Sequence, residues 1–323
     1  RDRSVSRGLG DVYKRQYIFG GKDERSQDLI QGITLAGVFF DEVALMPESF
    51  VNQATGRCSV DGSKYWFNCN PDGPYHWFKT GWIDKREEKH LLYLHFTMDD
   101  NLSLSEKIKE RYRSMYTGVF YRRYILGLWA MAEGIIYDMF DTAKHVISNL
   151  SELTNANYYV SCDYGTQNAT VFLLWCKDRL GRWVCCCEYY YSGRDEERQK
   201  TDTEYADDLE QWLDGIKPVK IVIDPSAASF IAELKKRGYA IKKAKNDVLD
   251  GIRFVASLLN QGKIAISDQC PNTIKEFGSY IWDQKASERG EDKPVKQHDH
   301  AMDALRYFCY TIIRKPGSIS ILK

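Results

Sequence analysis

The carboxyl-terminal half of the chain alternates apolar and amphipathic segments in an order that few folds accommodate. Three apolar runs separated by short turns come first and predict an antiparallel meander over residues 158–165, 169–176 and 183–191. Helices and strands then alternate. The expected helices are 203–213, 227–237, 247–259, 271–280 and 299–313, and the expected strands are 219–224, 240–243 and 263–266. The pattern predicts an α/β domain over residues 157–323.

Two of the expected strands end in an aspartate. Asp163 ends the first strand of the meander, and Asp224 ends the fourth strand before a Pro-Ser turn. A meander followed by alternating strands and helices is the ribonuclease H-like order, in which these two strands are adjacent and parallel, so both acids lie at the same end. The last helix begins in HDHAMDALRY, where Asp299, His300 and Asp303 can share a helix face because of their spacing.

Convergent carboxylates of this kind suit two-metal cleavage of phosphodiester bonds. Two Mg²⁺ or Mn²⁺ ions about 3.5–4 Å apart activate a water molecule and stabilise the leaving oxygen, and such hard ions require several oxygen ligands. The same residues also have an ordinary structural interpretation. A strand-terminal aspartate is commonly a turn residue, and Asp299 would cap a solvated helix whose Arg306 forms a surface ion pair.

The amino-terminal half contains an apolar run that ends in two acids. Residues 35–40 predict a buried strand of a parallel sheet, and Asp41 and Glu42 follow it. In nucleotide hydrolysis the first carboxylate would hold Mg²⁺ through water, and the second would polarise the attacking water. A strand followed by a polar turn is the simpler alternative.

Further segments place this acid pair in a larger domain. Residues 64–69 predict a second strand, and Asn70 follows it in a Pro-containing turn. A polar residue at the tip of the strand beside the acid pair is where an ATPase would sense the γ-phosphate. A third strand is expected over residues 90–96 and a helix over 103–116.

Four segments of the sequence carry a family resemblance. They are Ile30-Gln31-Gly32, VFFDE, NPDGPYHWFK and YRRYILGLWAMAEGIIYDMF. Together they resemble the large terminase subunit of tailed bacteriophages, a family that pairs a packaging ATPase with a nuclease, and the resemblance runs from Tyr17 to about Ile313. It implies that Asp41 and Glu42 are Walker B acids and that Asn70 belongs to the coupling motif. It favours Asp303 as a metal ligand, with His300 or Asp299 as a supplementary ligand or proton carrier.

The resemblance also implies a domain organisation. A partial P-loop-type ATPase domain is expected over residues 17–125 and a ribonuclease H-like nuclease domain over residues 157–323. Residues 126–156 are expected to be a linker, in which Gly127-Leu128-Trp129 and Gly134 mark the passage between the domains.

The phosphate-binding loop of such an ATPase is missing from this sequence. No G-x-x-x-x-G-K-[ST] motif occurs, and Gly20-Gly21-Lys22 is followed by Asp23 where a hydroxyl should bind Mg²⁺. We therefore expect that the loop lay upstream of a truncation and that this chain binds ATP poorly. Residues 1–16 fit no helix or strand pattern and back-translate in part to a transposon-end adapter, so native sequence is expected from Tyr17. A flexible basic arm is the alternative.

The charge balance and the cysteine content limit the possible binding partners and the cellular compartment of the protein. The 45 Lys and Arg residues balance 45 Asp and Glu residues, which excludes a uniformly basic nucleic-acid binder but allows a local basic groove near residues 235–237 and 242–245. No apolar stretch approaches the ~18 residues of a membrane span. The nine cysteines include no C-x-x-C pair, which is typical of reduced, mostly buried thiols in a cytoplasmic protein.

The residues and the resemblance together predict a fragment of a phage DNA-packaging terminase. It is expected to cut concatemeric double-stranded DNA with Mg²⁺ or Mn²⁺ and to carry an incomplete motor domain for ATP with Mg²⁺. The expected partners are double-stranded DNA, the portal protein and the terminase small subunit, with no membrane. The expected location is the host cytoplasm, transiently at the procapsid portal and not in the mature virion. The alternatives are another ribonuclease H-like nuclease, of resolvase or integrase type, or a catalytically silent portal-binding structural fragment.

Overall fold

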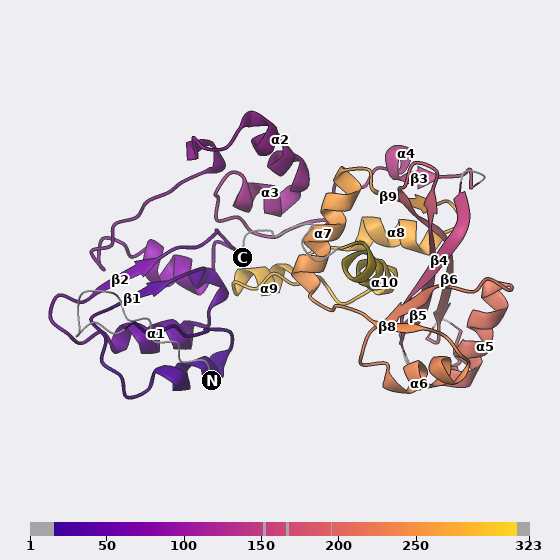
Figure 1. Cartoon of the computed structure of the whole chain (residues 1–323), viewed down its shortest axis with the longest axis horizontal. Helices are drawn as coiled ribbons and strands as arrows, with labels where there is room; N and C mark the ends of the chain where they lie inside the picture. Colours follow the sequence, from indigo (N-terminus) through magenta and orange to yellow (C-terminus); the bar gives the residue numbers. More distant parts are fainter. Residues whose placement is uncertain (1–15, 151–152, 166–167, 195, 315–323) are drawn as a thin grey trace. The chain divides into compact units, whose positions relative to one another are not determined.

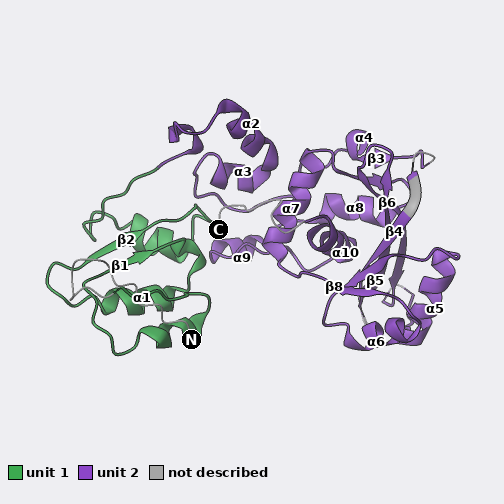
Figure 2. Ribbon diagram, viewed as in Figure 1, with its two compact units in different colours: residues 1–95, 323 green, residues 96–322 purple. Residues whose placement is uncertain are grey.

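The computed structural model describes residues 16–150, 153–165, 168–194 and 196–314. The adapter-like segment, apart from Gln16, therefore lies outside the described residues. The chain divides into two compact units, residues 1–95 and 96–322 (Figure 2), and each unit has its own sheet. No helix in the described part of the chain is long and apolar enough to cross a membrane.

The first unit is built around a parallel pair of strands. Its elements are η1 (Glu24–Ile30), β1 (Gly37–Phe40), η2 (Val43–Leu45), α1 (Glu48–Gly56), β2 (Lys64–Phe67) and η3 (Lys79–Ile83). Phe40 and Phe67 are register partners, and their rings stack with centroids 5.1 Å apart. The third strand expected over residues 90–96 is wrong. Its alternating apolar side chains, Leu92 and Leu94 among them, are exposed, and the described residues provide no neighbouring strand with which this segment pairs.

A seven-stranded sheet forms the centre of the second unit, in the order β3-β9-β6-β5-β4-β7-β8 (Figure 1). The strands are β3 (Val146–Ile147), β4 (Leu153–Asp163), β5 (Ala169–Asp178), β6 (Trp183–Ser192), β7 (Lys220–Ile223), β8 (Ile241–Lys243) and β9 (Ile264–Ser267). The predicted meander is confirmed, since β4, β5 and β6 are antiparallel neighbours. β7 lies parallel to β4, as the predicted strand order requires.

The α-helices of the second unit are α2 (Glu106–Met115), α3 (Gly118–Tyr124), α4 (Thr142–His145), α5 (Asp202–Leu213), α6 (Ala228–Lys236), α7 (Val248–Asn260), α8 (Pro271–Ser279), α9 (Gln284–Glu288) and α10 (His300–Phe308), which continues as the π-helical turn η5 (Cys309–Ile313). Helices α5 and α6 pack on one face of the sheet, and α7, α8 and α10 pack on the other. Successive side chains of β5 point to opposite faces. Val171 and Trp175 lie in the core with α7 and α10, whereas Phe172 and Leu174 lie in the core with α5 and α6. Trp175 stacks on Phe308, with ring centroids 4.4 Å apart.

Residues 126–156, expected as a linker, lie within the second unit. They contain α4, β3 and the beginning of β4. Ala132 and Tyr137 are buried in the same core as α7 and α10. All nine cysteines are free thiols, and seven of them are buried.

Candidate active site

The acids at the ends of β4 and β7 lie next to each other. Cys162 and Ile223 are register partners in this parallel pair. Asp163 and Asp224, each the following residue, therefore leave neighbouring strands at the same edge of the sheet. This is the arrangement that the predicted strand order implies.

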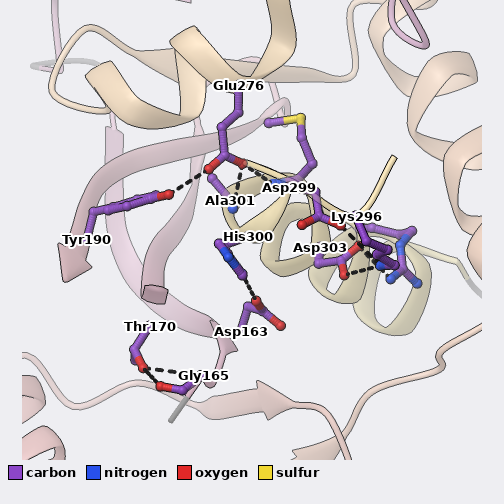
Figure 3. Close-up of polar contacts among 12 residues, drawn as sticks. Asp163, Gly165, Thr170, Tyr190, Glu276, Lys296, Asp299, His300, Ala301 and Asp303 are labelled. Atoms are coloured by element: carbon purple, nitrogen blue, oxygen red, sulfur yellow. Dashed lines mark hydrogen bonds and ion pairs between the residues drawn. The ribbon is translucent and has the colours of Figure 1, made fainter. Parts of the chain in front are cut away.

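The start of α10 reaches the same edge (Figure 3). His300 Nδ1 lies 2.9 Å from Asp163 Oδ2. Asp303 follows three residues later and is buried. Of the residues predicted in the last helix, His300 is thus the one in direct contact with an acid from the sheet.

Two cations balance the acids of α10. Arg306 Nη2 donates to Asp303 Oδ1 at 2.8 Å, and Lys296 Nζ lies 3.1 Å from Oδ2 of Asp303 and 3.1 Å from Oδ2 of Asp299. Asp299 is 4% exposed, and its side chain makes no capping hydrogen bond within the described residues. The structural alternative of a solvated helix capped by Asp299 is therefore wrong, because apolar residues surround α10 and bury it.

Burial and mutual repulsion set the protonation of this site. The pKa of Asp163 is raised to about 6, and burial is the main cause. The hydrogen bond with His300 opposes this rise, and the charges of Asp303 and Asp299 add to it. Burial alone would lower the pKa of His300, but the hydrogen bond and the charge of Asp163 outweigh burial and raise it. Asp163 and His300 each favour the charged form of the other through this contact.

The Tyr307 hydroxyl of α10 lies near all three predicted acids. Its pKa is raised first by burial and then by the charges of Asp303, Asp163 and Asp224. All three carboxylates thus lie within electrostatic range of one hydroxyl group. Carboxylate oxygens are the ligands that Mg²⁺ and Mn²⁺ prefer, so the donor set fits such an ion.

These oxygens already have other partners in the chain. Asp224 accepts hydrogen bonds from Ser226 N at 2.7 Å and from the side-chain amide of Asn246, and Asp303 is bound by Lys296 as described. Among the described residues, no three His, Cys, Asp or Glu side chains are already grouped around one metal position. An ion bound by Asp224 and Asp303 would compete with Asn246 and Lys296 for these oxygens.

Sequence reasoning missed four residues that surround the acids: Tyr190, Asn246, Glu276 and Lys296. Glu276 Oε2 accepts hydrogen bonds from Ala301 N at 2.8 Å and from Met302 N at 3.1 Å, and the Tyr190 hydroxyl donates to Oε1 at 3.0 Å (Figure 3). Burial raises the pKa of Glu276 to about 7, although these hydrogen bonds lower it. The contact of Lys296 could have been predicted, since Lys296 lies three residues before Asp299 in the sequence. The role of Glu276 could not have been predicted, because in the sequence it resembles a surface acid of an amphipathic helix.

The predicted nucleotide residues of the first unit meet at the ends of β1 and β2. Asn70 Nδ2 lies 3.3 Å from Glu42 Oε2. Asn68, which sequence reasoning missed, donates to Asp41 Oδ1 at 2.9 Å and accepts from Glu42 N at 2.7 Å. Burial raises the pKa of Glu42, hydrogen bonds from Asn70 lower it, and the charge of Asp41 raises it. The φ of 56° at Glu42 is in the left-handed region, a strained conformation that clusters at functional sites.

Known proteins resemble this chain along most of its length. Two family models match: "Terminase large subunit, T4likevirus-type, N-terminal" over residues 13–144 and "Terminase RNaseH-like domain" over residues 187–310. The large terminase of a thermophilic bacteriophage, in complex with ADP, is 62% identical over 93% of this chain and 74% of that chain, with a TM-score of 0.85. The structure of the same phage terminase with ATP-γ-S is 63% identical over 88% and 72% of the two chains, with a TM-score of 0.83. The large terminase subunit of Escherichia phage T5 is 25% identical over 97% of this chain and 72% of its own length.

The two family models follow one another along the chain in the order expected from the sequence. They confirm the predicted fold class, in which a terminase amino-terminal domain precedes a ribonuclease H-like domain. The thermophilic phage relative extends the likeness to nearly the whole chain at high identity. The chain belongs to the large terminase subunits of bacteriophages.

Proposed function

We propose that this chain is a metal-dependent endonuclease that cuts concatemeric double-stranded DNA during packaging. The observation that supports the proposal best is the convergence of Asp163, Asp224 and the first turn of α10 at one edge of the sheet. Family membership points to the same activity, because a ribonuclease H-like domain is part of the chain. It also disfavours a resolvase or integrase, which would not carry a terminase amino-terminal domain.

The chain offers oxygen ligands from three elements, with a supplementary ligand from the start of α10. They are Asp163, Asp224 and Asp303, with Asp299 or His300. Mg²⁺ or Mn²⁺ held by these residues would supply an activated water molecule and positive charge for the leaving oxygen. His300 Nδ1 faces Asp163 Oδ2 and would donate a proton to it in a hydrogen bond when the carboxylate is ionised. Arg306 fixes the Asp303 carboxylate from within the core.

Basic side chains lie beside the proposed site. Lys243 is the register partner of Ile223, the residue before Asp224, and Lys242 and Lys243 are both exposed. Exposed lysines at this edge suit the phosphates of a DNA backbone, whose neutralisation supplies sequence-independent affinity. The proposed substrate is therefore double-stranded DNA, cut with little sequence preference.

For the amino-terminal unit we propose part of an ATP-driven motor. Asp41 would hold the Mg²⁺ of bound ATP, Glu42 would polarise the attacking water, and Asn70 would couple hydrolysis to movement. The two structures of the thermophilic phage terminase, which contain ADP and ATP-γ-S, support nucleotide binding in this family. The motor is incomplete in this sequence, since the phosphate-binding loop is absent from it.

The proposed partners and location follow from family membership. They are double-stranded DNA, the portal protein and the terminase small subunit. The complex would form in the host cytoplasm, transiently at the procapsid portal, and would not remain in the mature virion.

The nuclease proposal is tested with purified chain, supercoiled plasmid, and Mg²⁺ or Mn²⁺. Nicking and linearisation that stop on chelation and are missing with Asp163→Ala would support it. Undiminished cleavage by Asp163→Ala would contradict the assignment of the site. A wild-type chain that binds DNA and cuts with neither ion would favour the silent portal-binding alternative.

A further inference from the structure

The first turn of α10 is capped by a residue from a different helix. A helix leaves its first N–H groups without partners inside the helix, and the preceding residue usually accepts them. In the described residues, Asp299 makes no such bond. Instead, Glu276 of α8 accepts from Ala301 N at 2.8 Å and from Met302 N at 3.1 Å, both through Oε2.

The Asp299 side chain contacts a lysine instead of the helix amides. A carboxylate that capped its own helix would be turned toward the helix amides. The Asp299 carboxylate instead lies 3.1 Å from Lys296, which is the same distance at which Lys296 meets Asp303. While Glu276 accepts from the helix amides, the carboxylates of Asp299 and Asp303 both face Lys296.

Glu276 is itself held in place. Its side chain is buried, with the residue 4% exposed, and the Tyr190 hydroxyl donates to Oε1 at 3.0 Å. The helix that carries it is capped in the same way, because Glu188 accepts from Asn272 N at 2.7 Å and from Thr273 N at 2.8 Å. Glu188 and Tyr190 are two residues apart on β6 and share one face of the sheet. A chain of side-chain contacts thus leads from β6 through α8 to α10.

We infer that Glu276 is a positioning residue of the nuclease site, which fixes the first turn of α10 so that His300 and Asp303 reach the edge of the sheet beside Asp163. The inference rests on the proposed nuclease function. The two capped amides, at residues 301 and 302, lie between His300 and Asp303, so a shift of these amides shifts both side chains. The contact of 2.9 Å between His300 and Asp163 is the part of the site that depends most directly on this cap. Outer partners that orient ligands commonly matter 10–100-fold for metal affinity or activity.

A cap stabilises any helix, so loss of stability alone does not test the inference. Thr201 provides a matched control, because it caps α5 by accepting from Glu204 N at 3.3 Å and α5 carries none of the proposed ligands. Glu276→Gln provides the conservative variant. Its amide oxygen still accepts from the two backbone amides, and its amide nitrogen donates to the Tyr190 hydroxyl.

The first measurement is the affinity of the full chain for Mn²⁺ by titration calorimetry. Glu276→Ala is expected to bind Mn²⁺ about tenfold more weakly than wild type. Glu276→Gln and Thr201→Ala are expected to bind it as wild type does, although Thr201→Ala lowers the melting temperature. Wild-type affinity in Glu276→Ala overturns the inference. A wild-type chain that binds no Mn²⁺ contradicts the proposed function and, with it, the role of Glu276.

The second measurement needs no metal. Hydrogen exchange of the Ala301 and Met302 amides is expected to be faster in Glu276→Ala than in wild type, and unchanged in Glu276→Gln. Unchanged exchange in Glu276→Ala overturns the cap itself. Should Glu276→Ala fail to fold, Tyr190→Phe replaces it, because it keeps the carboxylate and removes one hydrogen bond to it. Faster exchange and about fivefold weaker Mn²⁺ binding are then expected, and wild-type values of both overturn the inference.

Discussion

Lys296 Nζ lies 3.1 Å from Oδ2 of Asp303. The same atom lies 3.1 Å from Oδ2 of Asp299, so one ammonium group bridges two carboxylates of like charge. In the metal-free chain Lys296 offsets a repulsion that a bound cation would otherwise offset. Its side chain is 62% exposed and has room to leave toward solvent. A metal ion bound as proposed would therefore compete with Lys296 for the same oxygens.

Replacing Lys296 with methionine is expected to tighten Mn²⁺ binding. The gain should reach about fivefold at most, because an exposed ion pair contributes ~1 kcal/mol or less. The metal-free chain should melt at a lower temperature, since the two acids lose their shared cation. Titration calorimetry measures the affinity, and Lys293→Met, which removes an exposed lysine paired with Glu291, is the control. Weaker Mn²⁺ binding in Lys296→Met would show that the lysine supports the ion.

Removing an acid of the sheet edge should abolish cleavage and leave the fold intact. In Asp163→Ala the metal-free chain loses a carboxylate that the charges of Asp303 and Asp299 repel, so it keeps its stability. In Asp224→Ala it loses only the hydrogen bonds from Ser226 N and Asn246 at an exposed turn. Plasmid nicking with either ion checks the activity, and circular dichroism checks the fold. A variant that nicks at the wild-type rate would remove that residue from the site.

Asp303→Asn is expected to be inactive with either ion and also less stable. Arg306 is 1% exposed and binds Asp303, and a buried charge without its partner is destabilising. His300→Ala should remain folded and should narrow the advantage of Mn²⁺ over Mg²⁺, because Mn²⁺ tolerates nitrogen ligands more readily. Normal cleavage by Asp303→Asn together with an inactive Asp299→Asn would place the ligand one helical turn earlier.

The metal-free chain should lose stability at the site as the pH rises. Burial raises the pKa of Asp163 from 3.8 to about 6 and that of Glu276 from 4.5 to about 7. Between the unfolded and the folded pKa of each group, the folded state binds more protons than the unfolded state. The free energy of unfolding therefore falls as the pH increases through that interval. The raised pKa of His300 acts in the same direction, because its contribution is lost as the pH passes the folded value.

Thermal unfolding in the presence of a chelator measures this effect. The melting temperature should be higher at about pH 5.5 than at about pH 8, and the difference should shrink in Asp163→Asn. Added Mn²⁺ should oppose the trend, since ligands must be deprotonated to bind metal. A melting temperature that rises over this interval in wild type and Asp163→Asn alike would show that the site does not control the dependence.

Gly251→Ala is expected to destabilise the chain by about 1–3 kcal/mol. A Cβ at Gly251 would lie 2.6 Å from Arg306 Cγ, and Arg306 cannot yield without disturbing Asp303. Gly278→Ala on α8 is the matched control, because a Cβ there meets open space among the described residues, and a helical Gly-to-Ala change stabilises by up to ~1 kcal/mol. Chemical denaturation measures both, and equal stability of the two variants would contradict the expectation.

This chain should bind ATP poorly. Asp41 and Glu42 lack a loop of backbone amides to hold the phosphates. Calorimetry with ATP and Mg²⁺ is expected to show no micromolar binding, and Glu42→Gln should leave that result unchanged. Micromolar affinity in wild type would reveal a nucleotide site that the sequence motifs do not include.

The fold of the second unit was predictable because its periodicity is strong. The strands of the meander and the alternating helices and strands after it are separated by clear turns, and β4 and β7 pair as the order requires. Residues 90–96 show the limit of such patterns. Alternating apolar residues there predict a strand, but the pattern does not tell whether a neighbouring strand exists to pair with it.

The site was predictable where backbone geometry determines it. Asp163 and Asp224 follow register partners, so their proximity is a property of the parallel pair. Glu276 is different, because it acts on an amide 25 residues away through the crossing of α8 and α10. The structural alternative in which Asp299 caps α10 fails for the same reason, because the capping carboxylate comes from another helix.

Residues 301–308 of α10 are all buried, so the helix that carries the proposed ligands is also a central helix of the core. A close-packed interior tolerates little displacement. Substitutions that loosen the stacking of Phe308 on Trp175 should therefore silence cutting in a chain that still folds. Substitutions meant to change the cutting preference of the proposed nuclease have more freedom on the exposed strand β8, where Lys242 and Lys243 lie, than anywhere along α10.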